Sequence, residues 1–215
     1  MARRYDCNEA TDRATGLREA ASAVRRGELV VLPTDTVYGL GADAFGSEAV
    51  ADLLAAKGLG RSMPTPVLIG SPNTLHGLVT DFSEQAWELV DAFWPGPLTL
   101  VARHQPSLQW DLGDTRGTVT IRMPLHPVAI ELLTEVGPMA VSSANLTGHP
   151  APEDCDAAQQ MLGDSVSVYL DGGPTPGIVP SSIVDVTGKV PVLLREGALS
   201  PEELRKVVPD LEVAS

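Results

Sequence analysis

Polar side chains follow directly on a short apolar run near residue 30. The apolar residues 29–32 predict a buried strand, and Pro33 cannot extend a central ladder. Open α/β sheets usually bind ligands at the carboxyl ends of their strands, so the residues after the run are candidates for chemistry. These residues carry three hydroxyl groups and a carboxylate: Thr34, Asp35, Thr36 and Tyr38. Gly39 and Gly41 follow, and we expect them to let the backbone turn tightly or lie close to a ligand.

Other clusters carry hydroxyl, amide or cationic side chains at expected strand or helix ends. They are residues 57–61 after a helix, Thr118, Thr120 and Arg122 alternating on one strand face, residues 142–148 after a buried strand, and Ser181, Ser182 and Arg195. Arg grips a carboxylate or phosphate with two hydrogen bonds, whereas Lys acts as a point charge. The combination suits binding of phosphate together with a small zwitterion.

Each cluster also has a purely structural interpretation. Lys57 and Arg61 can form a solvated helix C-terminus, and Arg122 can protect a sheet edge. Serine and asparagine in a loop are usually turn formers, and residues 34–41 can be an ordinary turn. For each cluster taken singly the structural interpretation is the commoner outcome. Because all the clusters are expected at the ends of strands or helices, together they favour a shared ligand-binding site over separate structural roles.

Standard nucleotide and hydrolase motifs give little support. The chain has no G-x-x-x-x-G-K-[ST], and residues 39–44 match G-x-G-x-x-A only well after the strand has ended. No G-x-S-x-G occurs and the four histidines are scattered, which disfavours a Ser-His-Asp hydrolase.

The elements that must position these clusters alternate between short strands and amphipathic helices. We expect helices with an apolar face at residues 17–24, ending near Gly27, and at 153–162, and helices that begin at Ser47, Ser83, His126 and, with a capping box, Ser200. We expect strands at residues 29–32, 66–69, 98–102, 118–123, 139–142, 166–170, 182–186 and 192–195. Residues 103–117 and 172–180 are irregular, and such long loops tend to be functional or mobile. The pattern predicts one α/β domain with a large twisted mixed sheet flanked by helices.

Composition narrows the function classes. The 215-residue chain has a net charge of −13 and only 4% aromatic residues, which disfavours broad adhesion to nucleic acid or anionic membrane and a row of base-stacking rings. Cys7 and Cys155 are isolated, so a zinc site is not expected. No secretory or membrane-length apolar run is present, and we expect a cytoplasmic protein.

In this order, the clusters resemble the YrdC-like family of threonylcarbamoyl-AMP synthases. The match runs through PTDTVYGLGAD at 33–43, AAKG at 55–58, WPGPLTL at 94–100, IRMPLHP at 121–127, SSANLTG at 142–148, SSIVD at 181–185 and LLREG at 193–197. Seven motifs in register make the resemblance specific.

The resemblance implies an α/β sheet curved around a concave, positively charged site. It implies condensation of L-threonine with bicarbonate and ATP, with release of pyrophosphate, as the first step of tRNA threonylcarbamoyladenosine modification. A separate transferase complex would then act on tRNA, and direct contact with tRNA is a further expectation. We expect residues 1–215 to form one YrdC-like domain with its core at about 14–200, and no separate C-terminal domain.

The resemblance also implies roles for individual residues. L-threonine would be held by Thr36, Arg122, Ser143 and Ser181, and ATP by Lys57, Arg61, Thr118, Asn145 and Arg195. Lys57, Arg61, Ser143 and Asn145 would carry the catalytic role. ATP is expected as a substrate together with Mg²⁺, with no metal bound directly by protein ligands and no prosthetic group.

One position departs from the family pattern. The family has Lys-x-Arg where this chain has Lys57-Gly58-Leu59, so leucine replaces the arginine. Two further family positions, a polar residue and a histidine, are Met63 and Leu68 here. We expect Arg61 to supply the missing cation. The alternatives are a paralogue with another nucleotide or carbamoyl substrate and a non-catalytic RNA-binding module, the latter disfavoured by the acidic net charge.

Overall fold

One mixed β-sheet organises the computed structural model, which describes residues 2–176 and 179–214. The strand order is β1-β9-β2-β3-β8-β4-β7-β6-β10-β11-β12, with β5 paired to β6 alone. The strands are β1 (Arg3–Asp6), β2 (Val30–Leu32), β3 (Gly39–Asp43), β4 (Val67–Leu68), β5 (Val79–Thr80), β6 (Leu98–His104), β7 (Thr118–Arg122), β8 (Met139–Ser143), β9 (Val168–Asp171), β10 (Ser182–Asp185), β11 (Val192–Arg195) and β12 (Glu212–Val213). Parallel pairs such as β4–β7 and β6–β10 alternate with antiparallel pairs such as β3–β8 and β6–β7, so the prediction of a mixed sheet is confirmed.

Helices cover both faces of the sheet, and three of the described ones, α4, α6 and α7, begin at a residue whose side chain accepts from a free amide. They are α1 (Ala10–Arg25), α2 (Ser47–Lys57), α3 (Leu75–Leu78), α4 (Glu84–Phe93), α5 (Pro127–Val136), α6 (Cys155–Leu162) and α7 (Pro201–Arg205). The Ser83 side chain accepts from the Ala86 amide at the start of α4, and Ser200 forms a capping box with Glu203 at the start of α7. Gly27 follows α1 with φ of +79°, a conformation that ends a helix at low cost in glycine.

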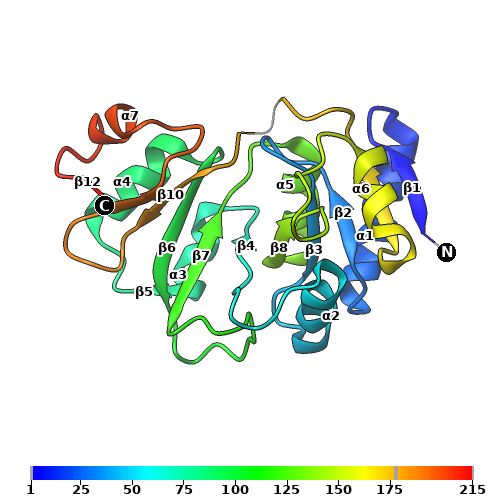
Figure 1. The fold of residues 1–215 in the computed structure, drawn as a ribbon, viewed down its shortest axis with the longest axis horizontal. Helices are drawn as coiled ribbons and strands as arrows, with labels where there is room; N and C mark the ends of the chain where they lie inside the picture. Colours follow the sequence, from blue (N-terminus) through cyan, green and yellow to red (C-terminus); the bar gives the residue numbers. More distant parts are fainter. Residues whose placement is uncertain (1, 177–178, 215) are drawn as a thin grey trace.

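Three apolar clusters hold the layers together. Helices α1 and α5 pack on one face of β2, β8 and β9, and α2 and α6 pack on the other face of β2 and β3. The third cluster joins α4 and α7 to one face of β6, β7 and β10 (Figure 1). The opposite face of these last strands has no helix in that cluster, which leaves their other side chains free to line a site.

The clearest difference from the sequence expectation concerns Gly39 and Gly41. They lie in strand β3 rather than in a turn, paired with Ser143 and Val141 of β8. A Cβ on Gly39 would come within 2.6 Å of Val141 Cγ1, and one on Gly41 within 2.7 Å of Met139 Cε. These glycines therefore make room for the side chains of the neighbouring strand.

Other differences are local. The N-cap of α2 is Gly46 rather than Ser47, and α6 begins at Cys155 rather than at residue 153. Strands β1 and β12 extend the sheet beyond the expected 14–200 core on both sides, since β1 pairs with β9 and β12 with β11. The irregular loop expected at 103–117 is shorter, because β6 continues to His104.

Among the described residues, no helix combines the length and apolarity needed to cross a membrane. Cys7 and Cys155 are both buried free thiols, and burial raises the pKa of Cys7 to about 11 and that of Cys155 to about 12. Neither thiol is a thiolate near neutral pH, so neither is a ready nucleophile.

Candidate active site

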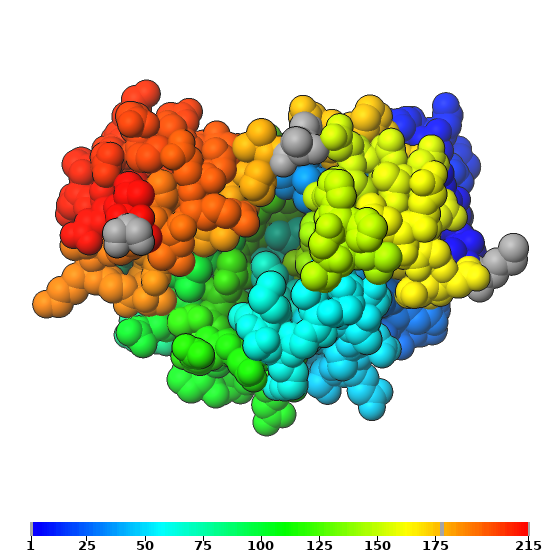
Figure 2. All heavy atoms as spheres, viewed as in Figure 1, coloured from blue at the N-terminus to red at the C-terminus, as the bar shows by residue number. Residues whose placement is uncertain are grey.

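A cavity of about 670 Å³ opens on the face of the sheet that α4 and α7 leave uncovered. Figure 2 shows it as a hollow between the cyan, green, yellow-green and orange segments. Its walls come from the loop after β2, the segment after α2, and strands β4, β6, β7, β8, β10 and β11. The predicted site residues that line it are Thr36, Arg122, Ser143, Ser181 and Arg195. Clusters far apart in the chain therefore meet around one cavity.

Arg122 forms the most enclosed corner. Its Nε donates to the Gly96 carbonyl at 3.0 Å, its Nη1 to Thr36 Oγ1 at 2.9 Å, and its Nη2 to Asp35 Oδ1. The guanidinium has five N–H donors, so one on each Nη remains beyond these three bonds. Burial lowers the pKa of Arg122, and Asp35 opposes that effect. The corner is charge-compensated, and two of its N–H donors have no partner in these three bonds.

Thr34 organises the loop that carries Thr36. Thr34 Oγ1 accepts from the amides of Thr36 and Val37 at 3.1 and 3.2 Å and donates to the Val37 carbonyl at 2.7 Å. This is the local hydroxyl–backbone bonding that favours threonine in turns. Thr34 also lines the cavity, although within this cluster only Thr36 was assigned to ligand binding.

Lys57 forms a second corner without lining the cavity directly. Its Nζ donates to the carbonyls of Ser143, at 2.5 Å, and Asn145, at 2.7 Å, and lies 3.3 Å from Asn145 Oδ1. Lys57 is only 4% exposed, and burial lowers its pKa to about 8. The ammonium is thus held behind Ser143, between the last residue of α2 and the end of β8.

Ser181 and Arg195 form the third corner, on the hairpin side. Ser181 Oγ lies 2.7 Å from Thr99 Oγ1, and Arg195 Nη2 donates to the Ser181 carbonyl at 2.8 Å. Thr99 lines the cavity but was not predicted. The only signal in the sequence is a threonine between two apolar residues, Leu98 and Leu100, and the structure shows that it is buried in β6.

Besides Lys57, the structure places three predicted residues, Thr118, Asn145 and Arg61, outside the cavity lining. Thr118 donates to the Thr115 carbonyl at 2.8 Å, and the Asn145 amide donates to the His149 carbonyl at 2.7 Å. Arg61 is exposed and turned to Asp111, with two bonds of 2.7 and 2.8 Å. Leu59, at the position of the family arginine, does line the cavity.

The cavity carries cationic character in an acidic protein. The ion pairs of the described chain include Arg122–Asp35 but none with Lys57 or Arg195, so these two charges keep no carboxylate partner. Within residues 2–176 and 179–214 there is also no group of three or more His, Cys, Asp or Glu side chains placed to hold a metal ion. The arrangement suits an anionic ligand better than a metal held directly by the protein.

A protein-family model for Sua5/YciO/YrdC, described as "Telomere recombination", matches residues 22–197. The chain belongs to the Sua5/YciO/YrdC family. A relative from Mycobacterium tuberculosis strain H37Rv, provisionally named a threonylcarbamoyl-AMP synthase, is 57% identical over 97% of this chain and 96% of its own length. The threonylcarbamoyl-AMP synthase of Bacillus subtilis strain 168 is 38% identical over 92% of this chain and 58% of its own.

A solved member of the Sua5/YciO/YrdC family shares the whole fold. The crystal structure of P. abyssi Sua5 complexed with L-threonine matches with a TM-score of 0.92 and 35% identity. The match covers 100% of this chain and 62% of that protein. This chain therefore spans about three fifths of the P. abyssi protein.

Proposed function

We propose that this chain is a threonylcarbamoyl-AMP synthase. It condenses L-threonine, bicarbonate and ATP to L-threonylcarbamoyl-AMP and releases pyrophosphate, the first step of tRNA threonylcarbamoyladenosine modification. The observation that carries the proposal is the cavity, in a fold shared with an L-threonine-bound Sua5. A charge-compensated arginine corner and Arg195 line it, and Lys57 lies behind its wall at Ser143. The cytoplasm, where the product would pass to a tRNA-modifying transferase, is the proposed location.

The reaction needs positioning and charge stabilisation rather than a protein nucleophile. The α-amino nitrogen of threonine bonds to the carbon of bicarbonate with loss of water, which gives a carbamate. A carbamate oxygen then attacks the α-phosphorus of ATP, and the bond to pyrophosphate breaks. Negative charge develops on the phosphate oxygens, so cations and hydrogen-bond donors fixed in advance lower the barrier.

The corners divide these tasks. The two remaining Nη donors of Arg122 would take the threonine carboxylate, with hydroxyls of Thr36, Ser143 and Ser181 around the rest of the amino acid. The proposed nucleotide side comprises Lys57, Arg61, Thr118, Asn145 and Arg195. Lys57 would act from behind Ser143, and Arg195 from the hairpin.

Magnesium would enter this site with the nucleotide. The described residues hold no cluster of acidic or imidazole ligands for it, so the proposal assigns its ligands to ATP oxygens and water. The protein's own cations would share the remaining phosphate charge.

Pyrophosphate release tests the proposal. Purified protein with ATP and Mg²⁺ should release pyrophosphate only when L-threonine and bicarbonate are both present. Release that needs neither, or needs a different amine, would favour the paralogue. Absence of release, combined with RNA binding, would favour the RNA-binding alternative.

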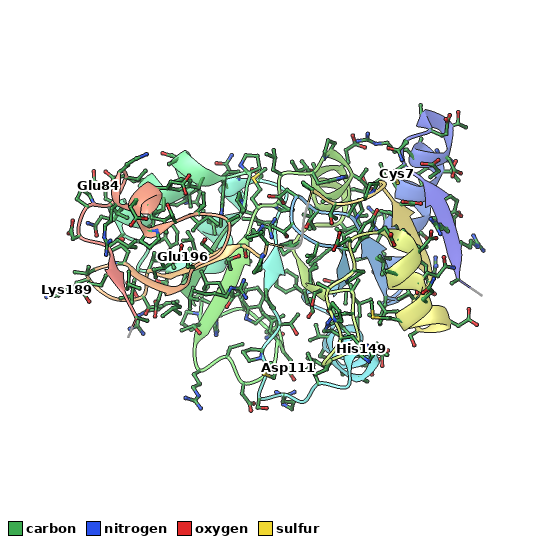
Figure 3. All side chains as sticks on the ribbon, turned by 45° about the horizontal axis from the view of Figure 1, so that its top comes forward. Cys7, Glu84, Asp111, His149, Lys189 and Glu196 are labelled. Carbon is green, nitrogen blue, oxygen red and sulfur yellow. The ribbon has the colours of Figure 1, made fainter. Side chains whose placement is uncertain are left out.

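A matched pair of variants links that activity to the cavity. Arg195→Ala removes a cation that lines the cavity, whereas Lys189→Ala removes one at the exposed far end of the β10–β11 hairpin (Figure 3). Only Arg195→Ala should raise the KM for ATP, by about tenfold for one charged hydrogen bond of roughly 1.5–3 kcal/mol. Equal effects of the two variants would contradict the assignment of Arg195.

A further inference from the structure

Two loops are joined beside the cavity through their backbones. The Asp114 amide donates to the Arg61 carbonyl at 2.8 Å, and the Thr65 amide donates to the Leu112 carbonyl at 2.9 Å. Gly113 lies so close that a Cβ there would come within 2.7 Å of the Arg61 carbonyl oxygen. The backbone of Arg61 is therefore fixed against the β6–β7 loop, and only its side chain is free to change direction.

The side chain of Arg61 is held outside the cavity by one aspartate. Its two Nη atoms donate to the two oxygens of Asp111, and Asp114 is a more distant partner at 3.9 Å. Arg61 nevertheless lies between Leu59 and Met63, which both line the cavity. The Arg61 side chain is exposed, so a change of rotamer is the route by which its guanidinium would turn toward the cavity.

The ion pair between Arg61 and Asp111 is weaker than the interaction that Arg61 would make with a nucleotide triphosphate. The side chains of Arg61 and Asp111 are 61% and 42% exposed, and exposed ion pairs contribute little because water and salt screen them. A triphosphate carries more charge than one carboxylate and matches the same two-pronged geometry of arginine. The Arg61 guanidinium holds the pKa of Asp111 below its usual value, so Asp111 is ionised near neutral pH and can pair with Arg61.

We propose that Asp111 competes with the triphosphate of ATP for Arg61. Asp111 is then a positioning residue. It holds the Arg61 side chain beside the cavity and weakens ATP binding, because the triphosphate must displace Asp111 from Arg61. The inference rests on the proposed function, in which Arg61 replaces the cation lost at Leu59. It adds a partner, 50 residues away in the sequence, that sets the affinity of that cation for ATP.

Direct binding of ATP with Mg²⁺ by titration calorimetry tests the competition without relying on turnover. The key variant is Asp111→Asn, which keeps an oxygen for the Gly113 amide but removes the charge that holds Arg61. Asp114→Asn is the matched control, because it removes a neighbouring charge that makes only a 3.9 Å ion contact with Arg61 and no hydrogen bond. Arg61→Ala and the double variant Arg61→Ala/Asp111→Asn complete the cycle.

Asp111→Asn should tighten ATP binding two- to fivefold, and the gain should shrink in 0.5 M NaCl. In turnover it should lower the KM for ATP while leaving the KM for L-threonine and kcat unchanged. Arg61→Ala should weaken ATP binding at least tenfold, and Asp111→Asn should have no effect in that background. Asp114→Asn should change binding less than twofold.

Three results would overturn the competition. Weaker ATP binding in Asp111→Asn would show that Asp111 supports the loop instead of opposing the nucleotide. An equal gain with and without Arg61 would show a general charge effect. Unchanged binding in Arg61→Ala would show that Arg61 does not reach the nucleotide. A protein that binds ATP as expected but releases no pyrophosphate with threonine and bicarbonate would contradict the proposed function alone.

Discussion

Two arginines beside the same cavity are paired with aspartates, yet the two pairs differ in surroundings. The side chains of Arg122 and Asp35 are 8% and 12% exposed, whereas those of Arg61 and Asp111 are 61% and 42% exposed. Arg122 also donates hydrogen bonds to Gly96 and Thr36. Among the described residues, the Arg61 side chain has no partner beyond Asp111 and its longer contact with Asp114. The first pair is part of the framework, and the second lies on its surface.

The difference in burial indicates which arginine keeps its aspartate partner and which can change partners. Removing one partner of a buried pair leaves an uncompensated charge in a poorly solvated place, which is costly. An exposed pair can be opened at little cost because water replaces the lost contact. We therefore expect the Arg122 corner to be a rigid receptor and the Arg61 loop to be adjustable.

The largest difference between the two ion pairs should appear in stability when the aspartate of each pair is removed. Asp35→Ala should lower the free energy of unfolding by about 3–5 kcal/mol, because Arg122 is left buried without its counter-charge. Asp111→Ala should change it by less than about 1 kcal/mol. Urea titration of both variants checks the prediction, and similar shifts for the two would remove the distinction between framework and surface.

The rigid corner should also discriminate between substrates. L-threonine should be preferred over L-valine by about 100-fold or more in kcat/KM, since a site built around hydroxyl groups leaves buried polar atoms unpaired when the substrate hydroxyl is missing. Pyrophosphate release with each amino acid measures the ratio. Equal turnover would mean that Thr36 and Ser181 do not hydrogen-bond to the threonine hydroxyl.

Lys57 is an intermediate case, buried like Arg122 but without a carboxylate. Its pKa is lowered to about 8, so it loses its charge as the pH rises through that value. ATP affinity should fall several-fold between pH 7.5 and 9.5 in the unmodified protein and stay flatter in Lys57→Met. Calorimetry across that range is the measurement, and parallel profiles would exclude Lys57 as the titrating group.

Stability should respond to the same titration with the opposite sign. Between about 8 and the ordinary lysine value of 10.5 the unfolded chain binds more protons at residue 57 than the folded protein. The free energy of unfolding, relative to that of Lys57→Met, should therefore rise with pH in this window. Below about 8 the full cost of burying the charge is present.

The smallest effect is expected on the adjustable side. Leu59→Arg should be neutral or activate up to several-fold, because it adds a cation to the cavity wall close to Arg61, which already supplies one. The KM for ATP is the measurement. A large gain, together with no effect of Arg61→Ala, would mean that this chain is an impaired or repurposed relative.

Local chemistry predicted much of the fold. The caps at Ser83 and Ser200, the end of α1 at Gly27 and the buried strand β2 all depend on neighbouring residues and are confirmed. Strand β3 was missed because glycines indicate turns when only the local sequence is considered. Its glycines are explained by side chains about 100 residues later in β8, which no local rule contains.

The candidate site was likewise predicted in part from the sequence and in part shown only by the structure. Residue types and the resemblance predicted that hydroxyls and cations from separate motifs would surround one ligand, and five of the predicted residues do line a single cavity. Thr99 was not singled out and Thr34 received no individual role, since a hydroxyl in a strand or turn is usually structural. The pairing of Arg61 with Asp111 was also not predicted, because the two lie in different loops.

The sequence by itself determined the chemistry of the groups, the starts of most elements and the family of the fold. Only the tertiary structure decided which cations remain available. Arg122 meets Asp35 across 87 positions, Arg61 meets Asp111 at the surface, and Lys57 is enclosed by carbonyl oxygens with no carboxylate. The free energy of a charge depends on its solvation and on its nearest opposite charge, and both depend on which distant segments pack around it.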